Sequence, residues 1–329
     1  MQHVPLVIVE RSGFPESVHY GSAIAIDAAG RHIVSIGDVN APILPRSSIK
    51  PIQTLAMIRA GLDLPPRLLA LASSSHPGEP QHTAGVLEIL QSARLDERDL
   101  KNTPDFPLGE CARRRWEREG LDASSLAQNC SGQHAAMLAT CITNGWDIAS
   151  YLDAEHPLQK RIARTLEELA GDSVGMARPD GCGVPTYPMS LAMLARCFAE
   201  LVTSAAATDV RTVVSAMTAY PELIAGTGRP STQIAKAIPD FLGKDGAEAV
   251  YVGAFSDGRA LAIKISDGGF RALWPAVAAL LSRMDPHPRL RLLEEEFTRG
   301  PSPQGQTQLR VLGMDSIAGK ELAANAYPS

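Results

Sequence analysis

The feature that most limits the fold of this chain is where its hydrophobic periodicity changes, with strand-like runs at both ends and helical spacing between them. Short β-rich runs alternate with turn signals between residues 6 and 36. Strand character returns at 249–255 and 260–265, and Ser256-Asp257-Gly258 joins these two runs as a hairpin signal. The pattern predicts that the two terminal segments share one, mainly antiparallel sheet.

Helical spacing dominates the middle of the chain. We expect these helices to cover the sheet or to form a lobe beside it, which makes the predicted class α+β. The sequence is interpreted as one domain over residues 1–329, with a helical lobe at roughly 47–220 and a polar C-terminal tail from about residue 285. The expected helical segments lie near 48–60, 81–93, 134–142, 158–169, 189–202, 212–217 and 272–284.

Length and charge exclude several classes of protein. A chain of 329 residues with 45% apolar content can bury a large core. The net charge is -5, and the basic run Arg113-Arg114-Arg115 is followed at once by acidic residues, so no nucleic-acid partner is expected. No run of about 18 apolar residues occurs, so no membrane span is expected either.

The number of cysteines and the N-terminal residues indicate the cellular compartment of the protein. Five cysteines are an odd and sparse set for this length, so we expect no disulfide framework and a reducing, cytoplasmic environment. The apolar run at residues 4–9 is too short for a secretory signal and has no basic leader.

A hydroxyl and an amine lie three residues apart in Ser47-Ser48-Ile49-Lys50-Pro51, where helical spacing begins. Residues three apart share one face of a helix, so the Lys50 amine can reach the Ser47 hydroxyl. Lysine is scarce, with 7 lysines against 24 arginines, and only lysine can lose its proton and act as a base. A serine that caps the helix beside an exposed lysine explains the same residues, so spacing alone leaves both readings open.

A second hydroxyl cluster, Ser73-Ser74-Ser75-His76, follows an apolar run that ends at residue 72. A turn between helices explains it as well as a catalytic role does. Lys264 interrupts an apolar strand, where its side chain points either to solvent or into the wall of a site. If it is buried, its amine needs a hydroxyl or carboxylate partner.

Two cysteines lie where a thiol could act as a nucleophile or bind a metal. Cys130 lies one helical turn before His134 at a predicted helix start, where the helix dipole favours a thiolate. Cys182 stands between two glycines in a predicted tight turn that begins at Asp180. Both thiols could converge on a zinc ion, but a CxxC pair is absent, so spacing alone supports a metal site only weakly.

Several segments, taken together and in order between about residues 15 and 270, resemble one family, the asparaginase II or rhizobial-type (class 3) L-asparaginases. The ordered set is far more specific than any single motif. The matching segments are Val18-His19-Tyr20-Gly21, Gly37-Asp38, Arg46-Ser47-Ser48-Ile49-Lys50-Pro51, Ser75-His76-Pro77-Gly78-Glu79, Asn129-Cys130-Ser131-Gly132, His134-Ala135-Ala136-Met137, Asp180-Gly181-Cys182-Gly183-Val184-Pro185, Lys244-Asp245-Gly246-Ala247-Glu248 and Ala262-Ile263-Lys264-Ile265.

The resemblance implies a fold similar to that of serine β-lactamases and glutaminases, and a homodimer. It also implies hydrolysis of L-asparagine to L-aspartate and ammonia through two Ser-Lys pairs. The residues that match the family's functional positions are Ser47 with Lys50 and Ser75 with Lys264 for the two pairs, Arg46, His134 and Asp180 for the substrate pocket, and Cys130 and Cys182 for the thiol ligands of a zinc ion.

One position departs from the family pattern. The family has a lysine as the third protein ligand of the zinc ion where this chain has Gln133. A carboxamide oxygen is a poor substitute for a neutral amine beside thiolates on zinc. We therefore expect zinc to be bound weakly, with Gln133 as a poor ligand, or not at all, in which case the thiols stay free or oxidise.

The function predicted from these residues is that of a serine amidohydrolase acting on L-asparagine. A β-lactamase or penicillin-binding protein is disfavoured because Ser-Asp-Asn and Lys-Thr-Gly do not occur in the sequence. A glutaminase with the same chemistry stays an alternative, since one methylene changes binding by only about 1–3 kcal/mol. A zinc or thiol sensing module around Cys130, Cys182 and His134 is the alternative from another class.

Overall fold

The computed structural model describes residues 2–204, 207–299 and 307–313 of the chain. The chain divides into two compact units. The sheet unit comprises residues 1–48, 189–203 and 237–329, and the helical unit comprises 49–188 and 204–236. The interpretation as one domain stays a prediction, but residues 189–203 group with the sheet and not with the helical lobe expected at 47–220.

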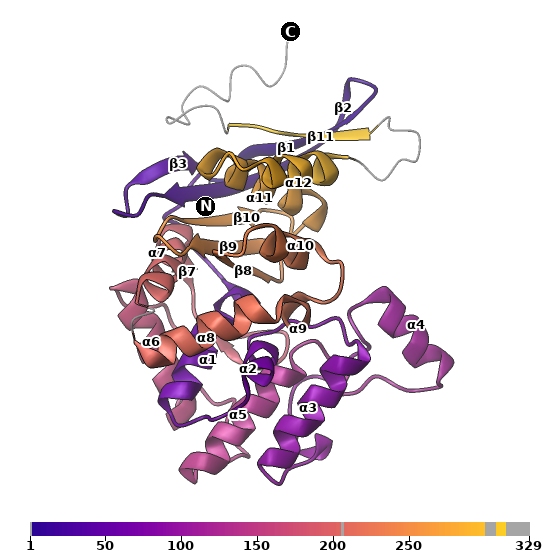
Figure 1. The fold of residues 1–329 in the computed structure, drawn as a ribbon, viewed down its shortest axis with the longest axis vertical. Coiled ribbons are helices and arrows are strands. Elements are labelled where there is room, and N and C mark those ends of the chain that lie inside the picture. The colour runs from indigo at the N-terminus through magenta and orange to yellow at the C-terminus, as the bar shows by residue number, and fades with distance from the viewer. Residues whose placement is uncertain (1, 205–206, 300–306, 314–329) are drawn as a thin grey trace. The chain divides into compact units, whose positions relative to one another are not determined.

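The sheet unit is built on an antiparallel sheet of seven strands, in the order β11-β1-β2-β10-β9-β8, with β3 also paired to β2 (Figure 1). The first part of β2 pairs with β1, and its last residues pair with β10 and β3. The N-terminal and C-terminal segments therefore share one sheet, which confirms the predicted α+β class. The strands are β1 Val4–Arg11, β2 Phe14–Ile26, β3 His32–Ile36, β8 Phe241–Gly246, β9 Val250–Phe255, β10 Ala260–Ile265 and β11 Thr307–Val311.

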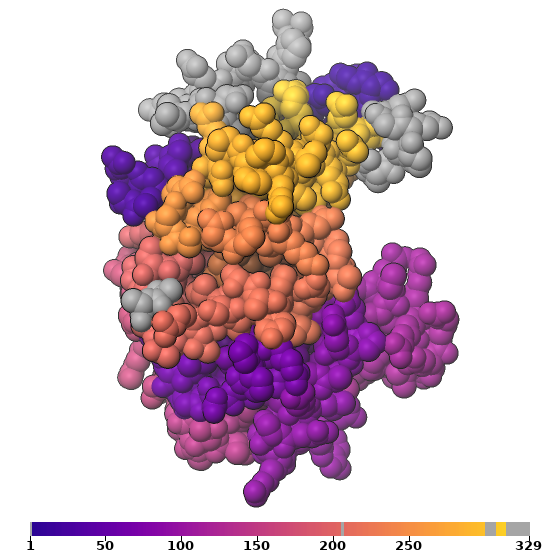
Figure 2. Space-filling model, viewed as in Figure 1, coloured from indigo at the N-terminus to yellow at the C-terminus, as the bar shows by residue number. Residues whose placement is uncertain are grey.

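Helices cover both faces of the central strands. Every residue of β9 and all but one of β10 are buried, and successive residues of a strand point to opposite faces, so both faces must be covered. Helix α7 (Leu191–Thr203) packs on β9 and β10, and α11 (Phe270–Met284) packs on β10 and β11. Helix α12 (Pro288–Thr298) packs on α11 and has only Leu290 buried, so most of it lies at the surface in Figure 2.

The segment beyond residue 285, predicted as a polar tail, holds α12 and β11. Strand β11 pairs with β1 at the end of the sheet order, from Val7 opposite Val311 to Arg11 opposite Thr307. The rest of the predicted tail, at 300–306 and 314–329, lies outside the described residues.

The helical unit follows local start and stop signals closely. Proline is the first residue of several helices, where its missing N–H has no partner to lose, and Gly145 and Gly171 end α5 and α6 in the left-handed conformation. The elements are α1 Lys50–Arg59, α2 Pro66–Ala72, α3 Pro80–Ser92, η2 Glu97–Asp99, α4 Glu110–Arg118, α5 Ser131–Asn144, α6 Pro157–Ala170, β5 Arg178–Pro179, β6 Pro185–Thr186, α8 Thr208–Ala219, α9 Pro221–Ala225 and α10 Pro230–Ala237.

No single helix in the described ranges is long and apolar enough to cross a membrane, although α7 and α8 pass that test when they are taken together. The hairpin predicted at Ser256-Asp257-Gly258 is present and joins β9 to β10, with Gly258 at a φ of 93°. Two short pieces, β4 (Pro42–Ile43) and β7 (Met189–Ser190), pair with each other in the sheet unit.

Candidate functional site

The segment that holds Ser47 is a tight turn. Residues Arg46–Ile49 form a 3-10 turn, η1, and α1 begins only at Lys50. The prediction that Ser47 caps a helix from residue 48 is therefore wrong, since Ile49 is the N-cap and no side chain caps this end. The reason is that the Ser48 N–H and hydroxyl both donate to the Pro45 carbonyl, three residues back, which closes a tighter turn first.

The end of β8 holds this turn from within the sheet unit. A Cβ atom on Gly246 would lie 2.7 Å from the Pro45 carbonyl oxygen and 3.0 Å from the Ser48 nitrogen, so only glycine allows so close an approach. Arg46 has a φ of 55°, a left-handed conformation that is uncommon for a residue with a side chain. Ser47 itself is buried. The sequence thus places a buried serine in a constrained turn.

Lys264 lies on β10 and is half-buried, and its amine donates to the Glu248 carbonyl. Burial lowers the pKa of Lys264 below its ordinary value, and the nearby Arg46 cation lowers it further. The carboxylates of Glu248 and Asp267 act in the opposite direction but do not cancel these effects. Lys264 therefore loses its proton more easily than a surface lysine does.

A histidine that carried no predicted role lies in the same unit. His19 pairs through Nδ1 with the Asp267 carboxylate at 2.6 Å, and Arg271 donates to its Nε2. Because Nε2 accepts, the proton of the neutral ring must lie on Nδ1. Asp267 is one of the two carboxylates that act on Lys264. The motif Val18-His19-Tyr20-Gly21 pointed to this residue, but nothing in the sequence indicated its partners.

Lys50 is fully buried in the helical unit, with 1% of its surface exposed. Its amine donates to the Ser74 carbonyl at 2.5 Å and also contacts the Cys130 thiol. No carboxylate forms an ion pair with Lys50 within the described residues. The alternative reading, an exposed lysine beside a capping serine, is therefore wrong.

Ser75 lies in the connection between α2 and α3, as the turn reading predicted, and is buried. Hydrogen bonds to two neighbouring segments hold the backbone of this connection in place. The Ser75 N–H donates to the Ile224 carbonyl on α9, and the His76 N–H donates to the Asn129 carbonyl just before α5. Further along, the Glu79 carboxylate accepts from the N–H and hydroxyl of Thr227. Ser75 thus occupies a rigid loop.

Cys130 and Cys182 come together in the helical unit. Both are buried. The Cys182 thiol and the nearby Lys50 lower the pKa of Cys130, whereas the Cys130 thiol and burial raise the pKa of Cys182. The Cys130 thiol donates to the side-chain oxygen of Asn129 at 3.5 Å.

The donors around these thiols do not fit a tightly held zinc ion. Gln133, the position of the expected third ligand, donates its side-chain amide to Gln53. Residues 2–204, 207–299 and 307–313 contain no group of three His, Cys, Asp or Glu side chains that could hold a metal. Structural zinc sites use four ligands, mostly Cys and His, and two thiols with a carboxamide fall short of that set.

His134 and Asp180 lie in the same unit. The His134 ring is fully buried, with Nδ1 2.6 Å from the Tyr151 hydroxyl and Nε2 without a partner among the described residues. Burial, and then the Lys50 charge, lower the pKa of His134 to about 3. Asp180 begins the turn that carries Cys182, and its backbone bonds to Val184.

Two further histidines, His76 and His82, stack 5.1 Å apart inside the helical unit. Burial lowers the pKa of both rings, so the folded protein holds them neutral while the unfolded chain takes up protons near pH 6.5. We expect the free energy of unfolding to fall as the pH drops below about 6.5, by up to about 1.4 kcal/mol per pH unit for each ring.

Urea unfolding at a series of pH values measures this loss. His82→Gln should flatten the dependence, while the same change at the exposed His32 should leave it unaltered. A midpoint that stays constant between pH 7.5 and 5.5 would show that these rings take up protons without unfolding.

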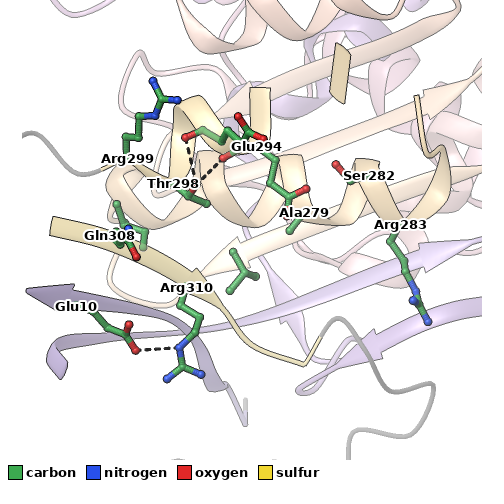
Figure 3. Close-up of a pocket in the computed structure, with 12 residues that line it drawn as sticks. Glu10, Ala279, Ser282, Arg283, Glu294, Thr298, Arg299, Gln308 and Arg310 are labelled. Atoms are coloured by element: carbon green, nitrogen blue, oxygen red, sulfur yellow. Dashed lines mark hydrogen bonds and ion pairs between the residues drawn. The ribbon is translucent and has the colours of Figure 1, made fainter. Parts of the chain in front are cut away.

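A prominent hollow of the sheet unit holds none of the predicted residues. It measures about 760 Å³ and lies among α11, α12, β1 and β11 (Figure 3). Arg283, Arg299 and Arg310 line it, and Arg310 is paired with Glu10. None of the residues predicted to take part in the reaction lines this cavity.

The predicted residues fall into two groups by unit. Arg46, Ser47 and Lys264 belong to the sheet unit. The others belong to the helical unit, and they are Lys50, Ser75, Cys130, Gln133, His134, Asp180 and Cys182. Each proposed Ser-Lys pair draws one residue from each unit, so the pairings stay predictions.

Comparison with known proteins gives one match over most of the chain. The model of the L-asparaginase II family matches residues 7–309. None of the curated proteins compared with the chain matches it. Similar solved structures include a crystal structure of Mglu, with a TM-score of 0.44 and 13% identity over 86% of this chain and 69% of that chain. Mglu in its native form has a TM-score of 0.43 and 12% identity over 86% and 66% of the two chains.

Proposed function

The chain belongs to the L-asparaginase II family, and from this we propose that it is an L-asparaginase, which converts L-asparagine and water to L-aspartate and ammonia. The family makes it an amidohydrolase. The identity of the substrate and the use of serine as nucleophile are our proposal.

The burial of Lys50 carries the proposal. It lies one position after the turn that ends at Ile49, its amine is buried against the Ser74 carbonyl, and no carboxylate holds it as an ion pair within the described residues. Ser47 in η1 and Lys50 at the start of α1 are three residues apart, a spacing that places two side chains on one face of a 3-10 or an α-helix, and this supports a Ser47-Lys50 pair. A lysine is rarely buried without a carboxylate beside it, and a role in proton transfer accounts for its position here.

In the proposed reaction, the Ser47 hydroxyl attacks the side-chain amide carbon while Lys50 accepts its proton. Ammonia leaves, and water then hydrolyses the ester on Ser47. Backbone N–H groups stabilise the oxyanion in both steps. Ser75 and Lys264 form the second pair, and the lowered pKa of Lys264 suits proton transfer.

Three residues are proposed to bind the substrate. The Arg46 guanidinium matches the α-carboxylate, because its planar fork can bind both oxygens. Asp180 is proposed to meet the α-ammonium group. His134 presents a buried Nε2 atom that has no partner among the described residues, and a substrate could satisfy it.

The resemblance to the family and the free cysteines support three further proposals, on the oligomeric state, the cellular location and zinc. We propose a homodimer, a location in the cytoplasm, where the five free thiols would stay reduced, and zinc that is bound weakly or absent. Where zinc binds, Cys130 and Cys182 would be its thiol ligands, with Gln133 as a poor third donor.

Release of ammonia from L-asparagine and L-glutamine, measured with added zinc and with a chelator, tests the function. We expect asparagine to be hydrolysed faster than glutamine, at a rate that zinc does not change. Faster turnover of glutamine would instead identify a glutaminase. No ammonia from either amide, together with stoichiometric zinc, would identify a sensing module.

A further inference from the structure

The segment between β10 and α11 is held against β2 by two hydrogen bonds. The Ser266 N–H donates to the Tyr20 carbonyl at 2.8 Å. The Asp267 carboxylate accepts from the His19 ring at 2.6 Å. Two consecutive residues of β2 therefore fix the part of the chain that directly follows Lys264 and the end of β10.

The His19 ring is itself held in one orientation. Arg271 on α11 donates to its Nε2 atom from Nε at 3.2 Å and from Nη2 at 2.9 Å. A guanidinium can only donate, so Nε2 accepts and the ring proton lies on Nδ1, the atom that faces Asp267. Only 9% of the His19 side chain is exposed, but half of the Asp267 side chain is. Without the His19 N–H, the Asp267 carboxylate would be free to turn toward water.

The same segment packs on the turn that accepts the Lys264 amine. A Cβ atom on Gly268 would lie 2.7 Å from a carboxylate oxygen of Glu248, so the two turns are in close contact. The Lys264 amine donates to the Glu248 carbonyl. Glu248 and Ala249 have φ values of 61° and 51°, a strained conformation that surrounding contacts must maintain. A continuous set of contacts therefore runs from His19 to the Lys264 amine.

We propose that His19 is a positioning residue for Lys264, on which it acts through Asp267 and the segment between β10 and α11. The inference rests on the proposed function, in which Lys264 transfers protons. The His19 N–H keeps the Asp267 carboxylate near the amine, and the segment that it fixes keeps the Glu248 carbonyl in place as the acceptor of the amine. Such placement matters because a shift of about 1 Å in a catalytic group can cost about 10²-fold in rate.

The first test measures the Lys264 amine directly and needs no substrate. The full chain is labelled with trace acetic anhydride at a series of pH values, and labelling of Lys264 is measured by mass spectrometry against the exposed Lys160. Only a neutral amine is acetylated, so the midpoint of labelling against pH gives the pKa of that amine. The charged or titratable groups that act on the Lys264 amine are Glu248, Asp267, Arg46 and His3.

We expect His19→Ala to move the midpoint to lower pH by about half a unit, because the released carboxylate no longer favours the charged amine. Asp267→Asn removes the same charge and should give a similar shift, and adding His19→Ala to it should shift the midpoint no further. His19→Asn supplies an amide N–H in place of Nδ1–H and should restore the midpoint. His32→Ala, at an exposed histidine on β3, is the matched control and should have no effect.

An unchanged midpoint in His19→Ala would overturn the inference, and so would a further shift when His19→Ala is added to Asp267→Asn. Asp267→Asn changes a half-exposed residue and should fold even if His19→Ala does not, and an unchanged midpoint in this variant would overturn the inference as well.

Ammonia release from L-asparagine separates this inference from the proposed function. We expect kcat of His19→Ala to fall about tenfold or more while KM stays within about threefold, and His19→Asn to recover the rate. A shifted midpoint with an unchanged kcat would uphold the link from His19 to Lys264 and contradict the role of Lys264 in the reaction. If the unaltered chain released no ammonia, the proposed function would fail, and labelling alone would decide the inference.

Discussion

Ser47→Ala is expected to abolish the release of ammonia from L-asparagine, with a fall in kcat of about 10⁴-fold or more. The hydroxyl is the group that forms the ester in the proposed reaction, and alanine supplies nothing that can replace it. Ser47 is buried in η1, and removing one hydroxyl should leave that turn intact. The measurement is a coupled ammonia assay, with circular dichroism to show that the variant is folded.

The adjacent Ser48 provides the matched control. Its hydroxyl donates to the Pro45 carbonyl at 2.7 Å, so Ser48→Ala should cost about 1 kcal/mol of stability but keep activity within about tenfold. If Ser48→Ala were the inactive variant and Ser47→Ala the active one, the nucleophile would be misassigned. If both kept full activity, neither serine would form the ester.

The fold class followed from the sequence because it depends on local periodicity. Strand-like runs at both ends and the Asp257-Gly258 turn are local signals, and the sheet and its β9–β10 hairpin confirm them. Pairing between distant strands was not accessible in the same way. Lys264 pairs opposite Ser22, about 240 positions earlier, and no local pattern fixes that register.

At the start of α1, local hydrogen bonds override the usual preference for serine at a helix N-cap. Serine before a helical run is a good N-cap, and this rule placed Ser47 there. In the structure Ser48 donates twice to Pro45 and closes a 3-10 turn, which moves the helix start to Lys50. The local sequence also does not show that Gly246, about 200 positions later, packs so closely on this turn that a Cβ there would lie 2.7 Å from the Pro45 carbonyl oxygen.

The surroundings of the candidate residues were the least predictable part. The sequence named Gln133 as the departure from the family, but only the structure shows that Gln53 receives its amide. It likewise named Lys264 without the Glu248 carbonyl that accepts from it, or the His19-Asp267 pair nearby. These contacts join segments far apart in the chain, so they cannot be predicted from local patterns in a single sequence.

Lys264→Arg is expected to lower the rate of asparagine hydrolysis by about 10²–10⁴-fold, the usual contribution of a general acid or base. Arginine keeps the positive charge but does not lose its proton, so it cannot replace a lysine that must act as a base. Lys264 is only half-buried, so the longer side chain should fit without unfolding. Lys160→Arg, at an exposed lysine paired with Glu155, is the matched control and should be fully active.

The dependence of kcat on pH distinguishes this role from a structural one. A base must be neutral to act, so activity should rise with pH. Because burial lowers the pKa of Lys264, the rise should begin below the ordinary lysine range near 10.4. The Glu248 carboxylate raises that pKa, so Glu248→Gln should move the rise to still lower pH. If the profile stayed in place in Glu248→Gln while Lys264→Arg remained active, Lys264 would serve only to hold the Glu248 carbonyl.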